Sequence, residues 1–586
     1  MLLEIVKEVY KYTQSNSKES WIFILGVFLA YHLILYPFFL SPLRDVPGPY
    51  LHRISSLSSL NKQRKGRWTM TVYELHKRYG DVVVLSPTEV SVNGNSKYVH
   101  DIYIKNFPKA KFYENFRNHG FKDNMFASLE NDRHIAYKKL IMNLYSKSAI
   151  FNKKNGTHSI IVQKVGQLVD EIRQSSVTGQ RPDYINAKSV HNEHGKGHKT
   201  QDGKWLNKSG KTQNLGIEVY TLFASLAMDV VSAFELGMSN GTDLLLHPEK
   251  RHIIISHRQV ASMVFWTTLM PRFWNWAASS TILKASYDIT KWQLGLYAQA
   301  EENVPDVKED ENKSTLETLK QKGLKGEYAY SFLTDNIFAG HETTAIQLAY
   351  MCYELSRPKN LHLQESLRKE LIREFGHPKS EKDIIDDMSK VDVLPYLNSV
   401  LDENSRVHAS IPGSEPRLVD SPYKVEVGEG KVVELPKGTG ISCVVYALHR
   451  QSDVFAEPDQ FIPERWLQYE NEPDEVFRQR IKRMQRYMMP FGKGIRMCLG
   501  MNLALIEMKM AIANLYWHYN SKICSDWCEI TEYTEDSKKL NPILMGETRK
   551  GENRTDEEKM TMYDSYTTRP LNDECWLEWY DNQFEN

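Results

Sequence analysis

The sequence has no net charge, few cysteines and no internal repeat. Its 74 basic residues balance 74 acidic ones, so no global electrostatic field recruits nucleic acid or an anionic surface. Six cysteines among 586 residues are too sparse for the disulfide framework of a small secreted protein, which favours a reducing compartment for the main body. We find no Gly-x-Gly-x-x-Gly motif between a strand and a helix, so no dinucleotide-binding fingerprint is recognisable.

One long apolar run stands apart from this composition. Residues 21–40 contain no formally charged side chain, and a helix of that length spans about 30 Å, enough to cross a bilayer. The run is too long for a signal-peptide core and no small-x-small cleavage site follows, while a buried core helix remains the alternative. Basic residues are concentrated just after the run, which favours a cytosolic C-terminal part. We expect a short lumenal segment at 1–20, a transmembrane anchor at 21–40 and an extended proline hinge at 41–50.

The remaining residues, 51–586, are expected to form one domain. Helical periodicity is clearest at 68–79, 218–236 and 328–357, and β-like runs lie at 81–92 and 423–433. Helices outnumber strands, which predicts a mainly α fold with small β-sheets. Residues 186–214 are polar, rich in Gly and Lys and nearly free of aliphatic side chains, so this segment is predicted to be a flexible insertion.

A glycine-rich loop near the C-terminus carries the clearest chemical signal. Residues 490–500 read PFGKGIRMCLG and lead into an apolar helical run at 501–517. Glycines permit tight turns, the helix N-terminus supplies amide N–H groups, and Arg496 adds a cation near Cys498. These surroundings suit a thiolate that binds a metal. A lone cysteine is ordinarily a small apolar core residue, but that alternative does not explain so specific a loop.

This loop resembles the haem-binding signature of the cytochrome P450 monooxygenases, through Phe491, Gly492, Arg496 and Cys498 with the glycines around them. The resemblance covers almost the whole chain, and residues 186–214 are the main unmatched part. It implies a cytochrome P450 fold (α+β) with one catalytic domain at 51–586. It also implies haem b, iron protoporphyrin IX, with the Cys498 thiolate as the axial iron ligand.

The haem propionates require cations, and the resemblance assigns them to Arg496, Arg417 and the helix that begins near His134. Many relatives have Trp-x-x-x-Arg in that helix, whereas this chain has His134-x-x-x-Lys138, as some fungal members do. A lysine therefore replaces the bidentate arginine fork. A solvated amphipathic helix is the alternative interpretation.

The stretch 339–344, AGHETT, resembles the oxygen-activating part of the family's central helix. In that resemblance Glu342 helps to relay protons, and Thr343 hydrogen-bonds the bound oxygen so that its distal atom leaves as water. A glycine inside a helix costs about 1 kcal/mol relative to alanine, so Gly340 needs a reason, and room for dioxygen would be one. The alternative is a buried Glu-Thr pair bonded to the backbone.

A third motif has a structural role in the family. Glu403 and Arg406 are three residues apart and share one helical face, so they can pair. Their place in the chain resembles the family's Glu-x-x-Arg helix, whose ion pair is joined by a later arginine, here Arg465. Such a buried set stabilises the fold around the cysteine loop only if every member keeps its partner.

The resemblance also implies the electron supply. Because the chain lacks a flavin or nicotinamide fingerprint, NADPH-derived electrons for O2 would come from a separate membrane-bound NADPH–cytochrome P450 reductase, with cytochrome b5 as an additional candidate partner. The basic run at 478–486 is, as a hypothesis, part of the reductase-docking face, and a solvated charge run is the alternative. The expected location is the endoplasmic reticulum membrane, as a single-pass protein with a cytosolic catalytic domain.

The substrate is expected to be small and apolar. Candidate contacts are Phe338, Ala339, Ile411 and Phe121, although core packing explains each nearly as well. The C-terminal sequences resemble fungal biosynthetic members, which favours a specialised metabolite such as an amino-acid-derived cyclic dipeptide. Two other functions stay open at this point: a haem-thiolate isomerase or dehydratase that does not use O2, which usually lacks a Glu-Thr pair, and a non-catalytic haem-binding membrane protein.

Overall fold

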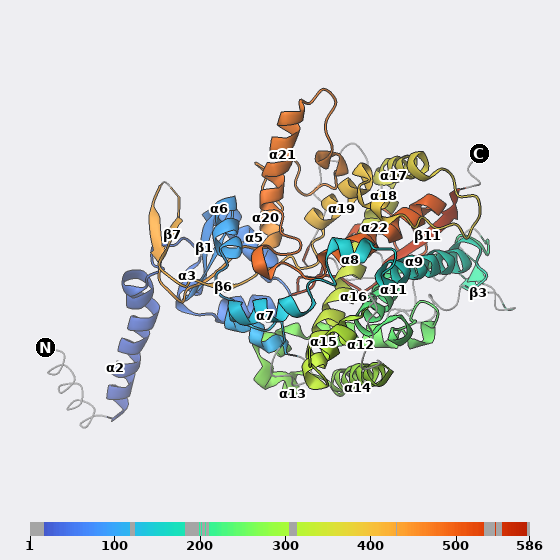
Figure 1. The fold of residues 1–586 in the computed structure, drawn as a ribbon. Helices are drawn as coiled ribbons and strands as arrows, with labels where there is room; N and C mark the ends of the chain where they lie inside the picture. The colour runs from blue at the N-terminus through green and yellow to red at the C-terminus, as the bar shows by residue number, and fades with distance from the viewer. Residues whose placement is uncertain are drawn as a thin grey trace.

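Helices dominate the part of the chain that the structure describes (Figure 1). The computed structural model describes residues 17–117, 124–181, 198–199, 201, 205–206, 210–303, 313–428, 430–531, 545–546 and 554–582. Four small sheets accompany the helices within these ranges. The prediction of a mainly α fold with small sheets is confirmed.

The N-terminal apolar segment stands apart from the body of the protein (Figure 1). It comprises α2 (Ser17–Ala30) and a continuing π-helix, η1 (Tyr31–Leu40), which contains Pro37. Only 6% of the apolar run 21–40 is buried, and Trp21 is 71% exposed. A soluble core helix would bury these side chains, so the segment's length, composition and exposure are compatible with a membrane anchor.

The proline-rich connection after this segment docks on the domain. Residues 42–45 form a turn, so the expected uniformly extended exit is wrong for this stretch. Pro47 accepts a hydrogen bond from the Val84 N–H at 2.8 Å, and α3 (Tyr50–Ile54) begins directly after Pro49. Arg53 donates to the carbonyls of Leu43 and Arg44, which holds the turn against α3.

Two long helices form the centre of the domain. They are α11 (Val219–Leu236), which is almost wholly buried, and α16 (Glu327–Ser356). The Glu218 carboxylate caps α11 by accepting the N–H groups of Tyr220 and Thr221. A Cβ added at Gly340 of α16 would lie 2.8 Å from Val231 Cγ2 of α11. Close packing of the two helices is therefore a structural reason for this glycine, and because Gly340 also lines the cavity, room for dioxygen stays a prediction.

The other helices surround this pair. Those that contribute residues to the site include α19 (Pro395–Val407) and α22 (Met501–His518), together with α7 (Asn131–Ile141) and α12 (His252–Ala261). The others are α4 (Leu57–Arg64), α5 (Trp68–Tyr79), α6 (Ser96–Val99), α8 (Lys147–Phe151), α9 (Gly156–Ile172), α13 (Trp274–Ala277), α14 (Ser280–Asn303), α15 (Thr315–Gln321), α17 (Leu361–Phe375), α18 (Met388–Asp392), α20 (Val445–Leu448), α21 (Asp474–Tyr487) and α23 (Asp556–Lys559).

The sheets are short. The four-stranded sheet has the order β1 (Val82–Ser86), β2 (Glu89–Val92), β9 (Gly440–Ser442) and β6 (Arg417–Leu418). The three-stranded sheet joins β10 (Tyr519–Ile523), β11 (Trp576–Asp581) and β5 (Gly216–Glu218). Two hairpins pair β7 (Tyr423–Glu426) with β8 (Val432–Leu435) and β3 (His198–Lys199) with β4 (Trp205–Leu206). The last hairpin falls within the predicted insertion 186–214, most of which lies outside the described residues.

Candidate active site

The cysteine loop is closed by its own backbone. The Cys498 N–H donates to the Phe491 carbonyl at 2.9 Å, and a short 3-10 helix, η11 (Gly494–Arg496), lies between them. Gly494 has φ +71°, and a Cβ there would lie 2.1 Å from the Tyr103 carbonyl oxygen. Only glycine fits at this crossing, both for its backbone angle and for the space. The sequence pattern of the loop is thus a packing requirement as well as a conformational one.

The Cys498 thiol faces a cavity inside the domain. The residue is exposed and lines the cavity wall. Burial raises the pKa of this thiol, while the N–H groups of Gly500 and Met501 and the charge of Lys138 act in the opposite direction. A bound metal cation would lower the pKa of the thiol more strongly and so favour the thiolate. The loop therefore presents a sulfur ligand to a space that can hold a large group.

One face of α16 forms the opposing wall of this cavity. Asp335, Ala339 and Thr343 recur every four residues, so they lie on one helical stripe, and all three line the cavity. Thr343 is half-buried, and its Oγ1 donates to the Ala339 carbonyl at 2.9 Å. The structure therefore brings Thr343, Ala339 and Cys498 to the same cavity from distant parts of the sequence.

Glu342 is held by partners on two other helices. Its Oε1 accepts hydrogen bonds from the Tyr220 hydroxyl and from Arg258 Nε, the latter at 3.1 Å. Burial raises the pKa of this carboxyl, but Arg258 and the neighbouring His341 lower it by more, so the pKa lies below its usual value. Glu342 is therefore an ionised member of a Tyr-Arg-Glu cluster at the cavity wall.

Three cations gather at another side of the cavity. Arg417 donates to the Tyr113 hydroxyl at 3.2 Å, and its Nε is buried without a hydrogen-bond partner. Arg496 binds the carbonyls of Ser128 and Leu129. The third cation is Lys109, whose pKa is far below its usual value because of burial and of these two arginines.

His134 and Lys138 lie beside the cysteine loop on α7. Lys138 Nζ donates to the carbonyls of Ile495 and Met497, both at 3.0 Å, and His134 Nε2 lies 3.3 Å from the Ile495 oxygen. Burial lowers the pKa of His134 to about 4, so its imidazole is neutral at physiological pH. In the structure both side chains tie α7 to the loop backbone.

The donors around the cavity fit a haem. A thiol on one wall matches an axial ligand, and the unpaired Nε of Arg417 marks a place for an anion. Three clustered cations repel one another unless anions approach them, and a haem carries two propionates.

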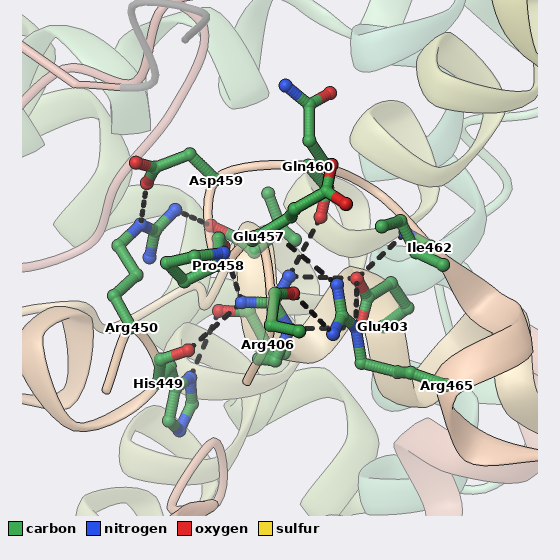
Figure 2. A network of polar contacts seen from close by, with 12 residues as sticks. Glu403, Arg406, His449, Arg450, Glu457, Pro458, Asp459, Gln460, Ile462 and Arg465 are labelled. Carbon is green, nitrogen blue, oxygen red and sulfur yellow. Dashed lines mark hydrogen bonds and ion pairs between the residues drawn. The ribbon is translucent and has the colours of Figure 1, made fainter. Parts of the chain in front are cut away.

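The side chains of Glu403, Arg406 and Arg465 lie together in one polar network (Figure 2). Arg406 binds both oxygens of Glu403, at 2.8 and 2.9 Å, and Arg465 Nε donates to Glu403 Oε1 at 3.0 Å. The other donors of Arg406 are satisfied by the carbonyls of His449, Pro458 and Gln460. The geometry matches the expected structural ion-pair set.

The basic run at 478–486 is largely occupied by local partners. Arg480 binds Glu472 and the carbonyl of Leu467. Arg483 pairs with Asp453 at 3.0 Å, and Arg478 pairs with Glu475 at 3.2 Å. Arg480 therefore holds α21 in place, whereas the exposed Arg478 and Arg483 keep their charges at the surface.

The expected substrate contacts are placed as follows. Phe338, Ala339 and Ile411 line the cavity, and Phe121 lies outside the described residues. Several polar residues of the cavity were not predicted from the sequence: Lys109, Arg258, Asp335, Glu415 and Tyr566. Asp335 precedes Ala339 by four residues, so helical spacing could have indicated that it lines the same cavity. Nothing in the sequence indicated the others.

Known proteins resemble this chain over most of its length. Residues 203–544 match the family model described as "Cytochrome P450". The chain is 26% identical to cytochrome P450 monooxygenase hkm5 of Aspergillus hancockii over 88% of its length and 91% of that protein. It is 26% identical to cytochrome P450 monooxygenase mfmF of Annulohypoxylon moriforme, over 88% and 97%. It is also 25% identical to fusicoccadiene 8-ol C-16-hydroxylase of Phomopsis amygdali, over 87% and 89%.

A mainly helical fold with a cysteine loop facing a cavity defines a haem-thiolate protein. The chain belongs to the cytochrome P450 family. Its relatives carry monooxygenase names, so the protein is a haem-thiolate enzyme of O2-dependent oxidation, in line with the sequence analysis. The alternatives of an O2-independent isomerase and a non-catalytic protein have no support among these relatives.

Proposed function

We propose that this monooxygenase binds haem b through the Cys498 thiolate and oxidises a small apolar specialised metabolite, using O2 and NADPH-derived electrons. The observation that supports this most directly is the exposure of the Cys498 thiol in the same cavity that Thr343 faces. When bound, the haem would supply oxygen activation and substrate oxidation, with electron density donated by the thiolate.

The chain's own residues would hold and orient the reactants. Arg417, Arg496 and Lys109 would bind the propionates, with His134 and Lys138 next to them, and Phe491 and Gly492 would lie against the cofactor. The Ala339–Thr343 segment would flank bound oxygen. The Thr343 hydroxyl now donates to the Ala339 carbonyl and would turn its proton towards that oxygen. The ionised Glu342 would accept and return protons at Oε1, where the Tyr220 hydroxyl already donates.

Electron transfer requires a partner in this proposal. NADPH–cytochrome P450 reductase, with cytochrome b5 as an additional donor, would approach the side of the cysteine loop near α21. Arg478 and Arg483 would contribute charge to that surface, while Arg480 is engaged internally. Residues 21–40 would anchor the protein in the endoplasmic reticulum membrane, with 1–20 in the lumen, 41–50 as the hinge and 51–586 as the cytosolic catalytic domain.

The substrate class rests on the cavity wall and on the relatives. Phe338, Ala339 and Ile411 offer apolar contacts, and Phe121 stays a candidate. One relative is named as a hydroxylase of fusicoccadiene 8-ol. We propose a fungal-type specialised metabolite, with amino-acid-derived compounds such as a cyclic dipeptide among the candidates.

The test is the carbon monoxide difference spectrum of the reduced, haem-loaded protein. Thiolate-ligated haem gives a strongly red-shifted Soret band, and Cys498→Ala is expected to abolish it because no other ligand replaces the sulfur. Cys528→Ala is the matched control and should keep the band. Survival of the band in Cys498→Ala would refute the ligand assignment. With reductase and NADPH, the wild-type protein should then consume O2 and oxidise substrate.

A further inference from the structure

Asp335 is a carboxyl group on the face of α16 that lines the cavity. Its Oδ2 accepts the Phe126 N–H at 2.8 Å, which fixes the orientation of the side chain. The other oxygen has no hydrogen bond among the described residues, and the half-buried side chain lines the cavity. Burial raises the pKa of Asp335 to about 7, although the Phe126 N–H and the charge of Lys109 act in the opposite direction.

Lys109 is the nearest cation, but it is engaged elsewhere. Its Nζ donates to the Phe126 carbonyl at 2.6 Å and lies 4.1 Å from the ring centre of Tyr113. The backbone of Phe126 therefore stands between the two charges, with its N–H on the acid and its C=O on the lysine. No ion pair within 4.0 Å joins Asp335 to a cation anywhere in the described ranges, and Lys109 belongs to the cationic cluster assigned to the propionates.

The other carboxyl groups of the cavity wall differ from Asp335. Glu415 lies 3.5 Å from Arg417, and Glu342 pairs with Arg258. Glu507 is only 3% exposed, and burial raises its pKa to about 8, so it is sealed in the protein and protonated at neutral pH. Among the described residues, Asp335 is thus the carboxylate that faces the cavity without a cation.

We propose that Asp335 binds a cationic nitrogen of the substrate, so that this enzyme oxidises an apolar molecule that carries a basic amine. The proposal rests on the proposed haem-thiolate function and specifies its substrate class. A buried carboxylate is costly unless it is paired, and a ligand cation would supply the missing partner. Asp335 lies two helical turns, about 12 Å along the axis, from Thr343. The oxidised carbon would therefore lie about that far or less from the nitrogen.

The experiment compares two matched probes in the haem-loaded protein. They are (4-phenylbutyl)trimethylammonium and its neutral tert-butyl analogue, which have the same shape, and the quaternary nitrogen cannot ligate iron. Binding is read from the shift of the Soret band during titration. The wild-type protein is expected to bind the ammonium at least about tenfold more tightly, the ratio for a charge-assisted contact of 1.4 kcal/mol.

Asp335→Asn keeps the size and polarity of the side chain and removes its charge. It should bring the ratio of the two affinities close to one while leaving the affinity for the tert-butyl analogue unchanged. Asp288→Asn, an exposed acid on α14, should retain the wild-type ratio. An unchanged ratio in Asp335→Asn would overturn the proposal, and so would a wild-type protein that does not prefer the ammonium.

The pH provides a second readout, because the charge of this probe does not change with pH. Its affinity should rise as the pH increases through about 7, where Asp335 ionises, and Asp335→Asn should lose that rise and keep only the dependence that comes from Lys109. The titratable groups near Asp335 are Lys109 and Tyr566. The pKa of Tyr566 is far above its usual value, and loss of the Lys109 charge at higher pH acts in the same direction. An intact thiolate Soret band in every variant separates failure of this proposal from failure of the haem assignment.

Discussion

Replacing the buried Glu403 carboxylate tests whether its ion pairs stabilise the fold. Glu403 and Arg406 are each 0% exposed, and the two Glu403 oxygens together accept five hydrogen bonds (Figure 2). The donors are Arg406 Nε, Arg406 Nη2, Arg465 Nε, the Trp466 indole and the Ile462 N–H, at 2.8 to 3.0 Å. Glu403→Gln keeps the shape of the side chain but leaves two buried guanidinium groups without an anion.

The expected cost is about 3–5 kcal/mol, as for other buried ion pairs that lose one partner. The unfolding entropy is about 2.1 cal/mol/K per residue, so a domain of roughly 500 residues shifts its melting temperature by about 1 °C per kcal/mol. Glu403→Gln should therefore melt about 3–5 °C below the wild-type protein. The assay is thermal unfolding followed by circular dichroism and by the carbon monoxide difference band.

The control for this measurement is Glu434→Gln on β8, because Glu434 is exposed and forms no ion pair in the described chain. It should melt within about 1 °C of the wild-type protein, since surface substitutions change stability by about 0.5 kcal/mol or less. A Glu403→Gln protein that melts together with this control would show that the buried set does not stabilise the fold, and the reasoning would fail.

Two other predictions concern the oxygen site and the N-terminal segment. Thr343→Ala should still oxidise NADPH with reductase present but release more hydrogen peroxide and less product, because the hydroxyl that would position a proton is lost. Thr318→Ala on α15 is the control. A product yield per NADPH in Thr343→Ala equal to that of the wild-type protein would contradict the role of Thr343. A protein that lacks residues 1–40 should move from the membrane fraction to the soluble fraction and keep its red-shifted Soret band, whereas continued sedimentation with vesicles would locate the membrane contact elsewhere.

The sequence predicted those features that depend on local spacing. Glu403 and Arg406 are three residues apart on one helix, and the glycines around Cys498 mark a loop that permits few other residues, so both could be recognised without coordinates. The fold class followed from helical periodicity in the same way. The 68–79 helix, for example, matches α5 (Trp68–Tyr79) at both ends.

The sequence could not predict contacts between distant segments. The Glu342 cluster needs Tyr220 from α11 and Arg258 from α12, and the isolation of Asp335 depends on the backbone of Phe126. The same limit applies to Gly340, because its close contact with Val231 of α11 could not be seen in the sequence. Tertiary packing determined these outcomes, and no periodicity encodes it.

Tyr103 connects the four-stranded sheet with the cysteine loop. Its hydroxyl donates to the Glu415 carbonyl and accepts the Cys443 N–H, each at 2.9 Å, while its own carbonyl lies against Gly494. A side chain at 494 would fit only if the segment around Tyr103 withdrew, which would break both hydrogen bonds. Because the clash is with backbone atoms, no substitution of the Tyr103 side chain would make room for a side chain at 494, and the cysteine loop can pass this segment only with glycine there.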